Sequence, residues 1–385
     1  MGYNSMHEEK EGVSVVDAEI GFDGHLLLIL SSGDILDAGL MPVPDPVYKI
    51  IHKVGGSRGG NVSPSVEAFI SVWATTAINE TITIPTQNIG TFNATVDWGD
   101  SSPLETITTY NGFSHVYAAI GEHTISITGT FPNIYINYGA SRLKIRKVLS
   151  LGNVGWTKLN NAFYGCANLN EFTVGSTDVS AVDNMSAMLG YCSSLTSVDL
   201  SSFDTSLVTT MQSMFQNCTG LTSLDLSNFD TSSVTNMYVM FQNCTALTSL
   251  NVSSFDTSSV TNMFAMFVNC SGLTSLDVSS FDTAIVTNMG YMFYGCSGLT
   301  SIVGVEDWDI TGLDGTADLT LFLTGGKMTT AQYDNLLVNW EAQAVFAGMT
   351  PSFGASKYTG VSAAATARAA LISADGWTIT DGGTV

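Results

Sequence analysis

The stretch LTSLDLSNFDTSSVTNMYVMFQNC, residues 221–244, decides the fold, because near-copies of it precede and follow it along the chain. The cysteine that ends this stretch marks a period, since each cysteine of the chain lies 26 residues after the one before it. A constant period of roughly 20–50 residues is typical of arrays in which every copy packs on its neighbours. The cysteines are Cys166, Cys192, Cys218, Cys244, Cys270 and Cys296.

Aligning the chain by this period gives columns of apolar residues. In the pattern L-x-x-L-x-L we expect a strand of a parallel sheet with its leucines pointing inward. One copy cannot bury its own apolar face, so the copies must stack into a leucine-rich-repeat solenoid. The main columns are Leu195, Leu221, Leu247, Leu273 and Leu299; Leu200, Leu226, Val252 and Val278; Phe203, Phe229, Phe255 and Phe281; and Met185, Met211, Met237, Met263 and Met289.

The second half of each copy has a different spacing. Val234, Met237 and Met240-Phe241 recur at intervals of three and four residues, which favours a short helix with one buried face. Ser233 or Thr235 precedes this run and is of a type that caps helices. The sequence therefore predicts a coil made of a strand and a helical return arm.

The cysteine column is interpreted as structural. Equivalent positions in stacked coils are separated by roughly 4.8 Å, which exceeds the Cβ separation of about 3.8 Å in a disulfide. A ladder also offers no reason to pair with one neighbour rather than the other. We therefore expect six buried, reduced thiols that behave as small hydrophobic groups.

The whole chain is expected to be mainly β with short helices, in four parts. Residues 1–60 comprise a β-hairpin (Leu26–Leu30 and Ile35–Leu36 around the turn Ser31–Asp34) and a linker with alternating prolines at 42, 44 and 46 and a flexible joint, Ser57–Gly60. A lone hairpin is marginally stable, so it should pack on a neighbour and serve attachment or oligomerisation. The other parts are an immunoglobulin-like β-sandwich over 64–150, the solenoid over 151–310 and an α+β cap over 311–385.

The sandwich and the cap have their own signals. Alternating apolar and polar residues predict strands at Thr81–Pro85, Ala94–Asp100, Phe113–Tyr117 and His123–Gly129. In the cap, Thr329 and Gln332 form a capping-box pattern before a helix, and a second helix is expected over Ser362–Ile372. A final strand is expected over Trp377–Gly383.

The charge balance narrows the range of partners. The formal net charge is −22, and Lys158 is the only basic residue between Leu151 and Gly326. Such a surface repels phosphate backbones and anionic lipids, which argues against nucleic acid as a partner. No apolar run reaches about 18 residues, so membrane insertion is not expected. The first residues lack the pattern of a signal peptide and the last residues lack an anchor signal.

The candidate binding residues lie on the open face of the predicted sheet. They alternate with the inward leucines, so we expect them to present small hydroxyls and carboxylates that recognise a host glycan or a protein. The alternative is a plain solvated strand face. These residues are Ser197, Asp199, Ser223, Asp225, Ser249, Asn251, Ser275 and Asp277.

A second ladder follows the phenylalanine column and comprises Asp204, Asp230, Asp256 and Asp282. Each aspartate is expected to accept backbone N–H groups of its own turn. Calcium binding remains open as an alternative, because stacked carboxylates repel one another unless they are solvated, hydrogen-bonded or bridged by a metal ion. No cofactor is otherwise expected.

Catalysis is not expected from these residues. A nucleophilic cysteine needs a neighbouring base, and none of the five histidines lies in the repeats. A glycosidase needs one differentiated pair of carboxylates rather than a row of identical ones. The chain has no C-x-x-C or H-x-x-x-H pair to suggest a zinc site.

Three stretches resemble known families. The repeat, L-T-S-L-D-L-S-x-F-D-T-S-x-V-T-N-M-x-x-M-F-x-x-C, resembles the BspA-like leucine-rich-repeat surface proteins over roughly 64–385. Val96–Ser102, followed by Phe113–Gly129, is similar to PKD-type domains, with Ser101 in place of the usual glycine and His115 at a structural position. Gly21–Gly39 is similar to a segment of phage tail-fibre and minor structural proteins.

These resemblances imply a non-enzymatic phage virion protein, a tail fibre or spike that binds a host receptor. It would contact other virion proteins through its N-terminal region, and fibres in general suggest a homotrimer by analogy. One alternative is a secreted BspA-like adhesin of the bacterial surface. Another is a purely structural decoration of the capsid or tail.

Overall fold

A computed structural model describes the strands within residues 15–40 and residues 68–385, except 111, 176, 314 and 316–318. The chain divides into two units, Met1–Ser63 and Pro64–Val385. The described residues are mainly β-structure and turns with two short α-helices, as the sequence predicts for the fold class.

The first unit contains an antiparallel sheet of β1 (Val15–Ile20), β2 (His25–Leu30) and β3 (Ile35–Leu40), in that spatial order. The pairing of β2 with β3 confirms the expected hairpin, and β1 is an additional strand. The turn Ser31–Asp34, the prolines at 42–46 and the joint Ser57–Gly60 lie outside the described residues.

The second unit begins with two packed sheets. The six-stranded sheet has the order β11-β10-β4-β9-β6-β7, and β5 (Glu80–Ile84) pairs with β8 (Phe113–Tyr117) in a separate sheet. The remaining bounds are β4 (Phe69–Thr75), β6 (Asn93–Asp97), β7 (Glu105–Ile107), β9 (Gly121–Thr130), β10 (Ile145–Ser150) and β11 (Glu171–Phe172). The four strands expected here are confirmed, and their inward residues share one core with the larger sheet.

The larger sheet leads directly into the repeats. β10 is antiparallel to β4 and parallel to β11, which belongs to the first repeat unit. The backbone N–H of Leu151 continues this link by donating to the carbonyl oxygen of Val174 (3.1 Å). As a result, a single apolar core runs from Phe69 to Trp377.

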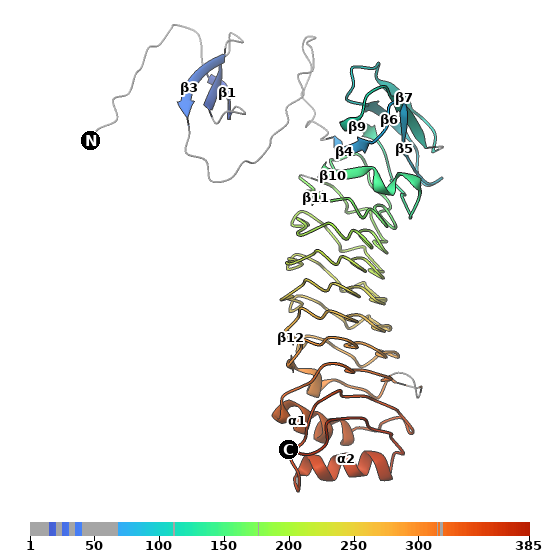
Figure 1. Cartoon of the computed structure of the whole chain (residues 1–385), viewed down its shortest axis with the longest axis vertical. Helices are drawn as coiled ribbons and strands as arrows, with labels where there is room; N and C mark the ends of the chain where they lie inside the picture. Colours follow the sequence, from blue (N-terminus) through green and yellow to red (C-terminus); the bar gives the residue numbers. More distant parts are fainter. Residues whose placement is uncertain are drawn as a thin grey trace, which may run out of the picture. The chain divides into compact units, whose positions relative to one another are not determined.

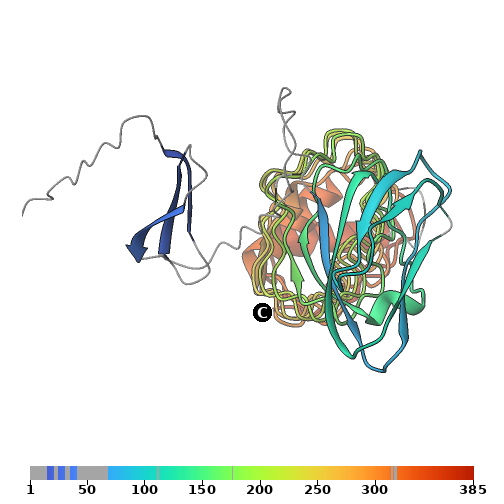
Figure 2. The same cartoon turned by 90° about the horizontal axis from the view of Figure 1, so that it is seen from above.

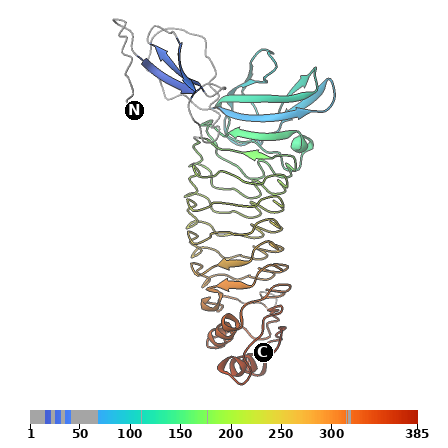
Figure 3. The same ribbon diagram turned by 60° about the vertical axis from the view of Figure 1, so that its left-hand side comes forward.

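Successive repeat units lie one above another in register, as Figures 1 and 3 show. Seen from above in Figure 2, their traces nearly superimpose. Parallel backbone bridges join equivalent positions of consecutive units, from Asn184 through Thr210, Asn236 and Asn262 to Asn288. The 26-residue period therefore corresponds to one step along the stack.

The L-x-x-L-x-L segment forms a regular parallel ladder between β12 (Ser275–Asp277) and β13 (Ser301–Val303). Single bonds continue the alignment in the earlier units, such as the one from the N–H of Thr222 to the carbonyl oxygen of Thr196 (3.0 Å). The expected strand is thus a regular ladder near the end of the stack and an extended arc elsewhere.

The predicted helical return arm is wrong, because the segment from Met237 to Cys244 forms turns. Its alternate N–H groups leave the coil: those of Met237 and Phe241 donate to the carbonyl oxygens of Asn262 and Met266 in the next unit. An α-helix would require these donors to bond four residues back within the coil. Val239, with a φ of 48°, also interrupts helical geometry.

The capping role expected for Ser233 or Thr235 is wrong for the same reason. The N–H and the hydroxyl of Thr235 both donate to the carbonyl oxygen of Thr209 in the preceding unit, at 2.9 and 3.2 Å. Ser233 lies exposed on the turn before it. Both residues therefore belong to a connection between units or to its surface.

The end of the second unit contains α1 (Thr330–Glu341) and α2 (Ala363–Ser373), shown in red in Figure 1. The capping box of Thr329 and Gln332 is present, and Ser362 caps α2 by accepting the N–H of Ala365. Tyr333, Leu336, Leu337 and Trp340 form the buried stripe of α1.

The strand expected over Trp377–Gly383 is wrong. The segment makes one isolated bridge, between Ser352 and Thr380, in which Thr380 donates to the carbonyl oxygen of Pro351. Gly383 then adopts a φ of 75°, so the chain turns before a second pair can form.

Candidate functional site

The eight candidate residues of the open face are all exposed, and those of each type repeat every 26 residues. The neighbouring Leu221, Leu226, Leu247 and Val252 are buried. The alternation of buried leucine and exposed polar residue thus has the polarity expected from the sequence.

The serines of this face form what we call the serine row: Ser197, Ser223, Ser249 and Ser275. The hydroxyl groups of these serines make no hydrogen bond to the described part of the chain, in contrast to the threonines beside them. The hydroxyls of Thr222 and Thr300 donate to carbonyl oxygens one unit earlier, at 3.1 and 3.2 Å. The serine row therefore keeps both donors and acceptors for a partner.

The acidic positions of the face are partly engaged in local turns. Oδ1 of Asp199, Asp225, Asn251 and Asp277 accepts the backbone N–H two residues later, each at 3.0 Å. The backbone hydrogen bond from Ser227 lowers the pKa of Asp225, and the hydroxyl of Ser279 does the same for Asp277. These carboxylates are therefore ionised near neutral pH, with their second oxygen left for solvent or a ligand.

The second aspartate ladder has the local role expected of it. Asp204, Asp230, Asp256 and Asp282 accept the backbone N–H of the residue two positions on, at 2.9–3.0 Å. The buried threonine that follows each aspartate donates to the next unit, as Thr231 does to the carbonyl oxygen of Asp256 (2.8 Å). The F-D-T-S turn thus stabilises itself and joins neighbouring coils.

The cysteine column lies in the core. All six thiols are free and buried, and five of them donate to a carbonyl oxygen of the preceding unit. Burial raises the pKa of Cys218 to about 12 and that of Cys244 well above its ordinary value. A thiol of this kind is a poor nucleophile, because the thiolate is the reactive form.

His115 lies in the β-sandwich rather than near the repeats. Its Nε2 is 2.6 Å from Oδ2 of Asp100, and its ring stacks on Trp98 with a centroid distance of 5.2 Å. Tyr117 donates its hydroxyl to the carbonyl oxygen of Trp98 (2.7 Å). Although desolvation opposes ionisation of Asp100, hydrogen bonds from Ser102 and His115 lower its pKa to about 2. The cluster fixes the turn after β6.

Metal-binding groups do not gather elsewhere in the described ranges. Within them, no three His, Cys, Asp or Glu side chains come together in a way that could hold a metal ion. His7 and His52 lie outside the described residues, and only the backbone of His25 is described.

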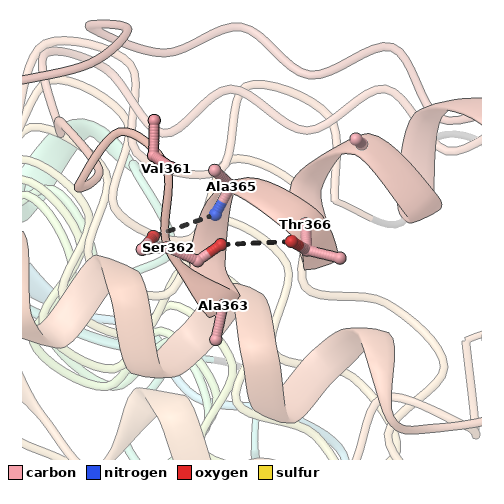
Figure 4. Close-up of a pocket in the computed structure, with 6 residues that line it drawn as sticks. Val361, Ser362, Ala363, Ala365 and Thr366 are labelled. Carbon is pink, nitrogen blue, oxygen red and sulfur yellow. Dashed lines mark hydrogen bonds between the residues drawn. The ribbon is translucent and has the colours of Figure 1, made fainter.

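One cavity of about 650 Å³ lies over the start of α2 (Figure 4). Val361, Ser362, Ala363, Ala365, Thr366 and Ala369 line it. The hydroxyl of Ser362 accepts the N–H of Ala365, and the hydroxyl of Thr366 donates to the carbonyl oxygen of Ser362. With its polar groups used in capping and no titratable side chain, this cavity has no catalytic equipment.

Sequence reasoning missed an aromatic cluster at the other end of the stack. The rings of Tyr138, Tyr164 and Tyr191 contact one another with centroid distances of 5.0–5.3 Å. Arg142 lies over the Tyr138 ring, 5.3 Å from its centroid. These tyrosines occupy different columns, so the period gives no sign that they meet; a cavity beside them is described below.

The comparisons give one family match. A family model described as "Mycoplasma protein of unknown function, DUF285" matches residues 157–251 and 222–335. These ranges overlap and lie on the stacked units and the beginning of the C-terminal part, so this portion of the chain is similar to that family. Searches of curated proteins and of solved structures found no match. Of the described helices, none has the length and apolar character to span a bilayer.

Proposed function

We propose that this chain is a non-enzymatic binding protein built on a leucine-rich-repeat solenoid, and that it presents its open face to a receptor. The serine row carries the proposal, because unbonded hydroxyls recur on four consecutive units above a buried apolar core. A regular row of donors and acceptors suits a partner that is itself repetitive or extended, such as a host surface glycan or a protein.

The chemistry of the other rows supports binding over catalysis. Their aspartates act in the turns of their own coils, and the thiols are buried. Catalysis requires groups with different protonation states brought to one point. Identical groups spread along a stack instead favour recognition over a long surface.

A virion location, as a tail fibre or spike, is the setting we favour. It draws on the likeness of Gly21–Gly39 to phage tail segments, where such a segment lies near the attached end. The N-terminal region would then contact other virion proteins, a PKD-like spacer over 64–150 would follow, and the repeats would reach the host.

A bacterial cell-surface adhesin is the second candidate. The match of residues 157–335 to a family described from Mycoplasma favours it, since that family is bacterial. Tail or portal genes beside the coding gene would support the virion setting, whereas an isolated gene encoding a secretion signal would support the adhesin. A pure decoration protein would label virions and never bind cells.

Binding of the full chain to intact host cells tests the proposal. Ser223→Tyr combined with Ser249→Tyr fills the serine row, and we expect cell binding to fall about tenfold or more through steric exclusion. Ser233→Tyr with Ser259→Tyr is the matched control, because these serines occupy the turn after the F-D-T-S aspartate. Equal loss in both double variants, or release of reducing ends from host polysaccharide by the unmodified protein, would contradict the proposal.

A further inference from the structure

A cavity of about 320 Å³ lies where residues 138–143 cover the first units of the stack. Gly165, Tyr191 and Asn217 are equivalent positions of three consecutive units and line it together, as do Ser193 and Thr219 of a neighbouring column. Tyr138 and Arg142 contribute from the other side. Its volume is at the lower end of the range of small-molecule sites, which fits one or two sugar units.

The glycine in this column makes room for the cavity. In later units the column carries asparagines, whose side chains occupy the same corner. At Gly165 there is no side chain, and the Tyr138 ring takes the space: an added Cβ would lie 2.7 Å from Cδ2 of Tyr138. The exposed fraction of Tyr138 is 45%, so its ring is available for packing against a ligand.

The asparagine column ends at this cavity with an unused donor. The Nδ2 of Asn269 donates to Oδ1 of Asn243, and the Nδ2 of Asn243 donates to Oδ1 of Asn217, both at 2.8 Å. The Nδ2 of Asn217 has no acceptor in the described part of the chain. The amide ladder thus directs a polarised N–H donor to the wall of the cavity.

Arg142 adds a cation to the same wall. Its Nη1 donates to the carbonyl oxygens of Tyr138 and Gly139, at 3.2 and 3.4 Å, which orients the guanidinium. No carboxylate pairs with Arg142 among the described residues, whereas the nearby Lys144 and Lys147 pair with Glu80 and Glu171. No aspartate or glutamate lines the cavity.

We propose that this cavity binds a carboxylate-bearing sugar, such as a uronic or sialic acid unit. The remaining N–H groups of Arg142 suit a carboxylate, since guanidinium and carboxylate match in geometry. The Asn217 amide and the hydroxyls of Ser193 and Thr219 suit sugar oxygens. The tyrosine rings suit the C–H face of the sugar, because the ring face is electron-rich. A donor-rich wall without acidic side chains favours an acidic over a neutral ligand.

Ligand-observed NMR and calorimetry on the full chain test this site with methyl β-glucuronide and methyl β-glucoside, which differ only in the carboxylate. The methyl glycoside of N-acetylneuraminic acid and acetate complete the set, and either acidic sugar supports the site. We expect an acidic sugar to bind about tenfold or more tightly than the glucoside or acetate, the ratio that one charged hydrogen bond provides. Equal binding of glucuronide and glucoside, binding of acetate alone, or no saturation transfer from any sugar would overturn the proposal.

Variants place the ligand in the cavity. Arg142→Gln should reduce the preference for glucuronide to about twofold or less, whereas Arg146→Gln, which removes the same charge outside the cavity, should leave it unchanged. Asn217→Gly, the residue that the column carries at 165 and 295, should weaken binding several-fold with the left-handed backbone retained. A loss with Arg146→Gln as large as that with Arg142→Gln would reject the site.

The proposal stands apart from the receptor face, because no residue of the serine row lines the cavity. The Ser223→Tyr and Ser249→Tyr variant should therefore bind glucuronide like the unmodified chain. Failure of glucuronide binding with intact cell binding would reject this site alone, and the reverse outcome would reject the serine row alone.

Discussion

The thiol of Cys244 donates to the carbonyl oxygen of Phe215 in the preceding unit, with the sulfur and oxygen atoms 3.2 Å apart. The same contact joins Cys218 to Leu189 and Cys270 to Phe241, each at 3.1 Å. The sulfur is therefore both part of the apolar core and a weak donor between coils. Each unit depends on its neighbour for this contact.

Thiol labelling should follow unfolding of the stack. Burial raises the pKa of Cys218 to about 12 and that of Cys270 well above its ordinary value, so reactive thiolate is scarce at pH 8. We expect no rapid reaction of the native chain with a thiol-exchange reagent and six reactive thiols after denaturation. Rapid labelling of native protein would show that the column is not buried.

Two threonines of one coil test the value of cross-coil bonds. Thr231 is buried and its hydroxyl bonds to Asp256, whereas Thr235 is exposed and its hydroxyl bonds to Thr209. Thr231→Val should reduce the free energy of unfolding by about 1–2 kcal/mol, because the Asp256 carbonyl loses a buried donor. Thr235→Val should cost clearly less, since water can replace its hydroxyl. Denaturant titration measures both, and equal losses would contradict this reasoning.

The asparagine column tests backbone and side chain separately. Asn243 has a φ of 62°, a left-handed conformation that glycine adopts freely and alanine does not. Asn243→Gly should lose the bonds of the amide ladder, and Asn243→Ala should lose these and add about 1 kcal/mol of backbone strain. Thermal unfolding should therefore rank the native chain first, Gly second and Ala last. The order Ala before Gly would show that backbone strain is not decisive.

The C-terminal cap should show a specific acid sensitivity. Burial disfavours ionisation of Asp381, but hydrogen bonds from Arg368 and Tyr333 outweigh it and lower its pKa. A lowered folded-state pKa gives stability that is present above the unfolded value of about 3.9 and lost as the pH falls through the folded value. Asp381→Asn should lower the free energy of unfolding by about 2–3 kcal/mol at pH 7, because it leaves Arg368 without its charge partner.

The pH profile provides the control for this pair. Below the folded-state pKa of Asp381, the native chain and Asp381→Asn should converge in stability, since both then lack the carboxylate. Glu341→Gln makes the same chemical change at the end of α1 and should shift the profile little. A constant difference between the native chain and Asp381→Asn down to pH 2 would show that the ion pair is not the source.

The sequence was most informative where one residue type repeats. Leu221, Phe229 and Cys244 each recur every 26 residues, so their common burial follows from the need of stacked coils for a shared core. The apolar spacing from Val234 to Phe241 misled, because intervals of three and four residues also suit an arc of turns. In this arc the N–H of Met237 bonds to the next unit, and a unit considered alone does not contain that acceptor.

The two proposed sites differ in the same way. The serine row could be located from its period, since Ser223 alternates with buried leucines. The cavity could not, because Tyr138 and Arg142 come from outside the repeats and meet Tyr191 and Asn217 only through the fold. A signal was nevertheless present: Gly165, Asn217 and Gly295 share one column, and residues of these types mark left-handed backbone.

A sulfur anomalous difference map from crystals of the full chain tests the stacking most directly. We expect the six cysteine sulfurs to form a single row, with each peak about 5 Å from the next, the spacing of adjacent hydrogen-bonded chains. Scattered cysteine peaks, or pairs about 2 Å apart as in disulfides, would contradict the stacked arrangement.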